Sequence, residues 1–385
     1  MHYDAIVVGL GAVGAGTLSQ LAMRGARVLG VDRFAPPHDQ GSSHGESRIT
    51  RLALGEGEAC APLVQRSHAL WRDLERRTGR QLMTTTGGLV LGPRDSGFLG
   101  RTIECAQRFG IAHGLLDAAA LRARFPQFAL RGDELGCYEP TAGFVRPEEA
   151  IAAQLDVARA AGASVQAGTP VLALEAAGDG VRVRTAGASH TADRVLLATG
   201  AWLPGVLADH GLADQLPPLK VCRQTMHWFD TGAAAADFAP GRFPVFIWAW
   251  GEGEGEGESL YGFPATDPAA PALKVAGEQY RQATTPDQLG RQVPLAESQA
   301  LYRERVAARF PQIGGRVLRA RACMYTVAPG GRFVVDALPG LPAVLVASAC
   351  SGHGFKHSAG LGESLAERLL GRRTTCDLGP FAVAG

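Results

Sequence analysis

Three glycines near the start of the chain, Gly9, Gly11 and Gly14, have the spacing of a phosphate-binding turn. They form a GxGxxG pattern directly after the apolar run Ala5–Val8 and before small residues that predict a helix over about 15–25. The first glycine allows a tight bend, the second lets backbone N–H groups approach a pyrophosphate, and the third lets the helix pack on the strand. We therefore expect a dinucleotide at the helix N-terminus.

Two later positions fit the same site. Asp32 follows the second apolar run, 27–31, where such turns place an acid that accepts hydrogen bonds from a ribose. The segment 194–202 predicts a strand that ends at Gly200, and a glycine there either admits a cofactor or makes a plain turn. The pattern does not distinguish NAD from FAD.

A polar segment, Gln40–Arg51, contains glycines, hydroxyls, a histidine and two arginines. If this segment is helical, Arg48 and Arg51 lie on one face and can point at one anionic site. A solvated loop that leads into the next helix explains the same composition.

A single cation interrupts the apolar run Leu273–Ala276, and it is Lys274. Such a lysine either extends to solvent or is held in a cavity for chemistry. A second glycine-rich turn, 350–358, precedes a helix predicted from about Ala359 to Leu370. We expect this C-terminal part to fold back onto the N-terminal nucleotide-binding part.

Composition excludes several functional classes. The 385 residues carry 38 basic and 37 acidic side chains, so no net field favours nucleic acid or an anionic membrane. No apolar run is long enough to cross a bilayer, and the chain begins with a strand, so we expect a cytoplasmic enzyme. The seven cysteines form no metal-ligand spacing. The Gly–Glu repeat at 251–258 predicts an exposed hairpin loop, and a flexible loop is a poor metal cage.

The predicted elements alternate between helices and strands and indicate an α/β fold. Further helices are expected at 62–77, 95–109, before Pro126, from Pro147 to Ala161 and at 294–310. Met83–Leu91 predicts a strand pair around Gly87 and Gly88. A passage from helix to strand is expected over 162–174, and further strands at 180–185, 190–197, 221–229, 244–250, 260–264, 321–326, 333–336 and 343–347.

Several motifs together resemble the monomeric sarcosine oxidase and N-methyltryptophan oxidase family of FAD-dependent amine oxidases. The matching stretches span nearly the whole chain in the family's order, and they are 4–32, 41–57, 261–264, 323–336 and 351–356. The Ser351–Lys356 motif, SGHGFK, and the upstream Cys323 are more specific than the glycine pattern.

The resemblance implies a Rossmann-like FAD-binding domain and a substrate domain with a mixed, mostly antiparallel sheet flanked by helices. It implies FAD joined to Cys323 by a thioether, and Arg321 could favour the thiolate that attachment needs. Read without the family, Cys323 is a buried strand cysteine. The expected cofactor-binding residues are Gly9, Gly11, Gly14, Asp32, Arg33, Ser42, Ser43, His44, Arg48, Val171, Gly200, Trp202, Cys323, Gly352, Gly354, Phe355 and Lys356.

The resemblance also assigns roles around the substrate. Arg51 and Lys356 match the pair that binds the substrate carboxylate, and Lys274 matches the lysine that promotes reaction with oxygen. The other expected catalytic residues, His44, Arg48 and Tyr325, lie beside the flavin, and Tyr261 lines the substrate cavity. Glu278 stands where the family has a histidine, and an acid there favours a more cationic or larger substrate or raises the amine pKa.

The implied reaction oxidises a secondary amine, an N-methyl or cyclic amino acid, to an imine and reduces O2 to hydrogen peroxide. One alternative is a dehydrogenase with another electron acceptor, and a second is a flavin-binding accessory protein without turnover. The expected partners are a small amine and O2, with a monomeric chain. We expect the FAD-binding domain over 1–80, 142–215 and 320–385, and the substrate domain over 81–141 and 216–319.

Overall fold

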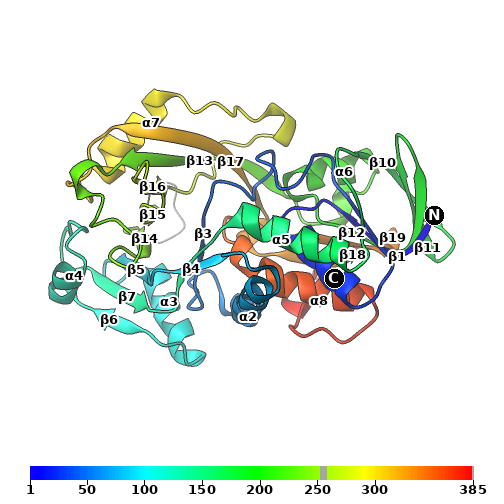
Figure 1. Ribbon diagram of the computed structural model, residues 1–385, viewed down its shortest axis with the longest axis horizontal. Helices are drawn as coiled ribbons and strands as arrows, with labels where there is room; N and C mark the ends of the chain where they lie inside the picture. The colour runs from blue at the N-terminus through cyan, green and yellow to red at the C-terminus, as the bar shows by residue number, and fades with distance from the viewer. Residues whose placement is uncertain (252–257, 384–385) are drawn as a thin grey trace.

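The computed structural model describes residues 1–251 and 258–383, and two large β-sheets organise them (Figure 1). In the first sheet β9, β2, β1, β12 and β19 run parallel in this spatial order. β2 is buried along its whole length, as expected for a parallel strand covered by helices. The strands are β1 (His2–Val8), β2 (Val28–Val31), β9 (Ser164–Gln166), β12 (Ser189–Leu197) and β19 (Leu341–Ser348), with antiparallel β10 (Val171–Ala177), β11 (Gly180–Thr185) and β18 (Val334–Leu338) beside them.

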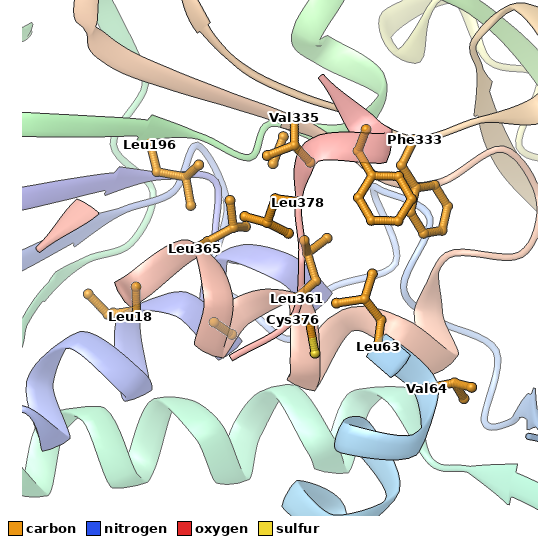
Figure 2. Packing of buried hydrophobic residues seen from close by; sticks show 14 of the residues in the cluster. Leu18, Leu63, Val64, Leu196, Phe333, Val335, Leu361, Leu365, Cys376 and Leu378 are labelled. Carbon is orange, nitrogen blue, oxygen red and sulfur yellow. The ribbon is translucent and has the colours of Figure 1, made fainter. Parts of the chain in front are cut away.

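Helices from both ends of the chain pack together on this sheet. A Cβ atom on Gly362 of α8 would lie 2.8 Å from the backbone carbon of Gly16 in α1, so the two helices approach at glycines. Figure 2 shows Leu18, Leu196 and Leu361 in the shared core. The prediction that the C-terminal part folds back is confirmed. The helices of this core are α1 (Ala12–Met23), α2 (Ala61–Thr78), α5 (Pro147–Ala160) and α8 (Ser358–Leu369), whereas α6 (Leu203–Asp209) packs on the other face of the sheet.

The second sheet has the order β17, β13, β16, β15, β14, β5, β7, β6. Among the described strands of this sheet, β14 and β5 are the one pair that runs parallel. The expected mixed, mostly antiparallel sheet is therefore confirmed. Aromatic rings fill its core, and the stacked rings of Phe128 and Phe243 have centroids 4.9 Å apart. The strands are β5 (Gly88–Gly92), β6 (Gly114–Leu116), β7 (Leu135–Glu139), β13 (Lys220–Asp230), β14 (Val245–Ala249), β15 (Ser259–Phe263), β16 (Ala272–Ala276) and β17 (Val317–Val327).

Helices also flank the second sheet (Figure 1). They are α3 (Gly97–Arg108), α4 (Ala118–Arg124) and α7 (Leu295–Leu301), and one π-helical turn, Tyr302–Val306, continues α7. The helices expected at 95–109, before Pro126 and at 294–310 are confirmed. β14 and β15 pair on either side of the Gly–Glu repeat, but residues 252–257 lie outside the described chain, so its hairpin loop stays a prediction.

A small third sheet joins β3 (Arg48–Thr50) and β4 (Met83–Thr85) to the two edges of β8 (Gly143–Val145). This rules out one alternative and corrects one prediction. Arg48–Thr50 is extended rather than helical, because its backbone pairs with β8. Met83–Leu91 holds two strands that do not pair with each other, because β4 joins β8 whereas β5 joins β14 and β7.

The strands divide between the sheets much as the two expected domains divide the chain. The strands of the first sheet fall within 1–80, 142–215 and 320–385, and β5–β7 and β13–β16 fall in the remaining segments. β17 crosses the expected boundary at 319/320 and belongs to the second sheet. The domain division itself stays a prediction.

Candidate active site

One large cavity, of about 1060 Å³, lies against the carboxyl ends of β1, β2, β12 and β19. Ligands of parallel α/β sheets bind at this end of the strands. Of the expected site residues, Gly14 and His44 do not line the cavity. Those that line it are Gly9, Gly11, Asp32, Arg33, Ser42, Ser43, Arg48, Arg51, Val171, Gly200, Trp202, Tyr261, Lys274, Glu278, Cys323, Tyr325, Gly352, Gly354, Phe355 and Lys356.

The three glycines of the first turn have different environments. Gly9 has φ +89°, and a Cβ atom on it would lie 2.5 Å from the carbonyl oxygen of Ala198. A Cβ atom on Gly14 would lie 1.7 Å from the carbonyl oxygen of Gly9, so this glycine serves helix packing. A Cβ atom on Gly11 would meet only Ser43 Oγ, at 3.8 Å. Protein packing does not require Gly11, so it keeps open the space in front of α1.

Asp32 holds this turn from inside. Its Oδ2 accepts a hydrogen bond from Leu10 N at 2.7 Å, and its Oδ1 accepts one from Phe34 N at 2.8 Å. A carboxylate has further lone pairs, so these bonds leave acceptor capacity toward the cavity. The first turn of α1 has no side-chain cap, and its N–H groups face the cavity beside Gly11.

Cys323 lies on β17 in the cavity wall and is 3% exposed. Its Sγ lies 3.7 Å from Arg48 Nη2 and 3.6 Å from the carbonyl oxygen of Ser42. Arg321, which we expected to act on this thiol, is exposed on the same strand. The cation in contact with the sulfur is therefore Arg48, which carbonyl oxygens of Ser42 and Ser47 hold at 2.8 and 2.9 Å.

Lys274 is 3% exposed, and its ammonium group donates to Gly45 O at 2.7 Å, Ser47 O at 2.9 Å and Ser47 Oγ at 3.0 Å. Its Nζ also lies 4.3 Å from the ring centroid of Phe263. Burial, and then the nearby Arg48, lower the pKa of Lys274 well below its usual value. Of the two sequence interpretations, the structure favours the lysine held in a cavity.

Arg51 and Lys356 converge on one carboxylate that belongs to the protein. Arg51 Nη2 lies 2.6 Å from Glu56 Oε2, and Lys356 Nζ lies 2.8 Å from Glu56 Oε1. Burial alone would raise the pKa of Glu56, but Arg51 and Lys356 more than offset burial and hold this pKa well below its usual value. The pair can therefore bind a carboxylate in this geometry.

A pair of tyrosines faces the same space. The hydroxyl oxygens of Tyr261 and Tyr325 are 3.1 Å apart. Burial raises the pKa of Tyr261 to about 12, and burial together with Tyr261 raises the pKa of Tyr325 well above its usual value. Glu278 lines the same cavity, and its charge raises the pKa of both tyrosines.

His44 lies behind the wall rather than on it. It is buried, and its Nε2 has no hydrogen-bond partner among the described residues. Burial, and then Arg48, lower the pKa of His44 to about 3, so its imidazole is neutral. Its expected place beside the flavin stays a prediction.

Sequence reasoning missed Glu56 and two glutamates that hold the backbone of the site. Glu139 accepts from Leu52 N and Ala53 N, each at 3.0 Å, and Glu148 accepts from Gly45 N at 2.6 Å. The glycines on both sides of Glu56 were the one available signal, since they allow a charged side chain to turn inward. The described residues contain no cluster of side chains suited to a metal and no helix that could cross a membrane.

Comparison with known proteins identifies the protein family of this chain. A family model described as FAD dependent oxidoreductase matches residues 4–368. The chain belongs to the FAD dependent oxidoreductase family. Monomeric sarcosine oxidase of Streptomyces avermitilis is 38% identical over 380 residues, which cover 98% of this chain and 96% of the relative. N-methyl-L-tryptophan oxidase of Salmonella agona is 34% identical over 384 residues, covering 100% and 99%. The resemblance inferred from the motifs is confirmed.

Solved structures with little sequence identity share the fold. NikD, an unusual amino acid oxidase essential for nikkomycin biosynthesis, has a TM-score of 0.84 at 24% identity, covering 99% of this chain and 97% of that one. Glycine oxidase from Geobacillus kaustophilus has a TM-score of 0.80 at 20% identity, covering 100% and 98%. These likenesses confirm the predicted fold class.

The residues present fit FAD. The open space at Gly11 and the uncapped N-terminus of α1 lie against the cavity. Cys323, Arg48 and Lys274 line the same cavity. This arrangement suits a long ligand with phosphates at one end and a reactive ring at the other.

Proposed function

We propose that this flavoprotein amine oxidase oxidises the secondary amine of an N-methyl or cyclic amino acid to an imine and reduces O2 to hydrogen peroxide. The observation that carries the proposal is the pair Arg51 and Lys356, which already holds a carboxylate in the wall of the cavity that contains Cys323. The names of the curated relatives, oxidases of sarcosine and N-methyl-L-tryptophan, support the substrate class.

The substrate carboxylate would replace Glu56 between Arg51 and Lys356. Both cations are buried, so they orient the carboxylate more strongly than surface charges would. The Tyr261 and Tyr325 hydroxyl pair then faces the rest of the substrate, and their raised pKa values keep both neutral and able to donate hydrogen bonds. Nearby cations favour the neutral amine, which is the form that can be oxidised.

The bound flavin would supply the two-electron acceptor for the amine. On the protein side, Lys274 provides a fixed positive charge that stabilises anions formed as oxygen is reduced. Glu278 would add negative charge near the tyrosine pair, which favours a substrate with a second cationic group over sarcosine. We also propose that the protein acts as a monomer and that its partners are a small amine and O2. Light scattering of the purified protein tests the oligomeric state.

The test is a panel of N-methyl, cyclic and primary amino acids scored by peroxide release. We expect the fastest release from secondary amines that carry a carboxylate. If the panel reduces the flavin without peroxide release and a quinone reoxidises it faster than air does, the protein is a dehydrogenase instead. If no amine bleaches the flavin, the amine oxidase proposal is wrong.

Covalent attachment through Cys323 is a separate proposal, supported by the contact of its sulfur with Arg48. Acid precipitation of the purified protein should leave the yellow flavin in the pellet. Cys323→Ser should release the flavin into the supernatant, whereas Cys350→Ser, which alters another thiol in the same cavity wall, should not. Flavin retained in the Cys323→Ser pellet would defeat the assignment.

A further inference from the structure

The turn Gly45–Ser47 lies between a carboxylate and the buried Lys274. Glu148 Oε1 accepts from Gly45 N at 2.6 Å and from Glu46 N at 3.2 Å, and its Oε2 also lies 3.2 Å from Glu46 N. Two successive backbone N–H groups thus converge on one anion. On the other side of the turn, the carbonyl oxygens of Gly45 and Ser47 accept from Lys274 Nζ.

This turn has a backbone conformation that needs support. Gly45 has φ +94° and Glu46 has φ +71°, and a glutamate rarely adopts a positive φ. A Cβ atom on Gly45 would lie 2.7 Å from Met226 Cε, so the turn also packs tightly against the second sheet. The hydrogen bonds that Glu148 accepts hold Gly45 and the strained Glu46 in place, and the turn thereby fixes the acceptors of Lys274.

The charges lie in the same order as the hydrogen bonds, with the carboxylate of Glu148 on one side of the turn and the ammonium group of Lys274 on the other. Glu148 is in the first turn of α5, and its negative charge meets the N–H of Glu46, which belongs to the same peptide group as the Gly45 carbonyl that faces the lysine. Oriented peptide groups between an anion and a cation stabilise both. The hydrogen bonds of Lys274 within the described chain all go to this turn, so a shift of the turn would move its ammonium group.

We propose that Glu148 is a positioning residue that locks the Gly45–Ser47 turn and thereby fixes the ammonium group of Lys274 in the cavity wall. The consequence for oxygen reduction rests on the role proposed for Lys274 above. Glu148 touches the substrate cavity at no point and acts through the turn.

The chain offers a matched control on the same helix turn. Glu149 is exposed and pairs with Arg80 at 3.2 Å, so it has the same charge and helix position but no contact with the turn in the structure. Glu148→Gln keeps an acceptor oxygen and loses the charge, whereas Glu148→Ala loses both. Comparison of these variants with Glu149→Ala separates the effect on the turn from any effect on α5.

The first measurement is amide hydrogen exchange of the purified holoenzyme. Glu148→Ala should exchange the Gly45 and Glu46 amides about tenfold faster or more, since it loses charge-assisted hydrogen bonds, and Glu148→Gln should be intermediate. In Glu148→Ala, acetic anhydride should also acetylate Lys274 faster than in the wild type, as followed by mass spectrometry. Glu149→Ala should change neither rate. Unchanged exchange and acetylation in folded Glu148→Ala would overturn the proposal.

The second measurement separates the two half-reactions by stopped flow. Glu148→Ala should slow reoxidation by air about tenfold, as the lysine charge shifts, while anaerobic reduction by the amine stays within about twofold. Equal slowing of both would mean that the variant loosens the whole site, which contradicts the proposal. Glu148→Gln, which should fold as the wild type does, keeps the test valid if the alanine variant is unstable.

Lys274→Met distinguishes failure of this inference from failure of the proposed function. If Lys274→Met reoxidises at the wild-type rate, the oxygen role of Lys274 is wrong. The exchange and acetylation results would still decide whether Glu148 positions Lys274.

Discussion

Lys274 and Lys356 are both buried in the wall of one cavity, yet their surroundings differ. Lys274 donates to two carbonyl groups and a hydroxyl, all electrically neutral, whereas Lys356 meets the carboxylate of Glu56. Burial lowers the pKa of both, and Glu56 partly offsets this for Lys356. The cation without a counter-ion can respond to a transient anion, and the paired cation must first exchange one carboxylate for another.

Replacing the unpaired lysine should produce the largest effect. Lys274→Met should slow reoxidation by air on the order of 10²–10³-fold, because a preorganised charge is lost from the oxygen site. Anaerobic reduction should be nearly unchanged in stopped flow. The control is Lys220→Met, since Lys220 is an exposed lysine at the edge of the same cavity. Equal loss in both half-reactions would remove the distinction between the two lysines.

Replacing the paired lysine should instead weaken substrate binding. Lys356→Met, like Arg51→Ala, should raise KM for amino acid substrates on the order of 10–100-fold, the value of a lost charge-assisted bond. KM for the matching amine without a carboxylate should change little. Steady-state peroxide assays with the two substrates measure the contrast, and equal changes for both would place the carboxylate elsewhere.

The pH dependence should follow the unpaired lysine. Because burial lowers the pKa of Lys274, its ammonium group loses its proton below the pH at which an ordinary lysine does. Reoxidation should therefore slow as pH rises through that lowered value, by up to about tenfold per pH unit. Lys274→Arg keeps its charge and should lack this decline. An alkaline increase in the wild-type rate would show that the neutral amine is the active form.

Removing the internal carboxylate should have the smallest kinetic effect and the opposite sign. Glu56→Gln removes the competitor of the substrate carboxylate, so KM should fall by about a few-fold. The variant leaves Arg51 and Lys356 without a counter-ion, so its Tm should fall and a bound substrate should restore much of it. If KM rises, Glu56 assists binding rather than competes with it.

The parts of the molecule that depend on local chemistry could be predicted from the sequence. The roles of Gly9 and Gly14 follow from turn geometry, and the strand and helix around them were correct. Lys274 stood out because a lone cation in an apolar strand needs a reason. The family motifs then brought distant residues such as Cys323 and Lys356 to one cavity.

What failed depends on contacts between segments distant in sequence. The helical alternative for Arg48–Thr50 was wrong because β8, about a hundred residues later, pairs with this segment. The strands in Met83–Leu91 have partners in different sheets, which no local pattern specifies. Glu148 looks like an ordinary residue of a helix start, and its role is visible only when the Gly45–Ser47 turn lies against it.

The position of β17 has a mechanical consequence. This strand is part of the second sheet, whereas the Gly9–Gly14 turn belongs to the first. A flavin joined to Cys323 and seated at that turn would be a cross-link between the two sheets. Such a link limits how far the sheets separate when the protein begins to unfold, as a disulfide does in secreted proteins. The cofactor would then contribute to the durability of the fold as well as to its chemistry.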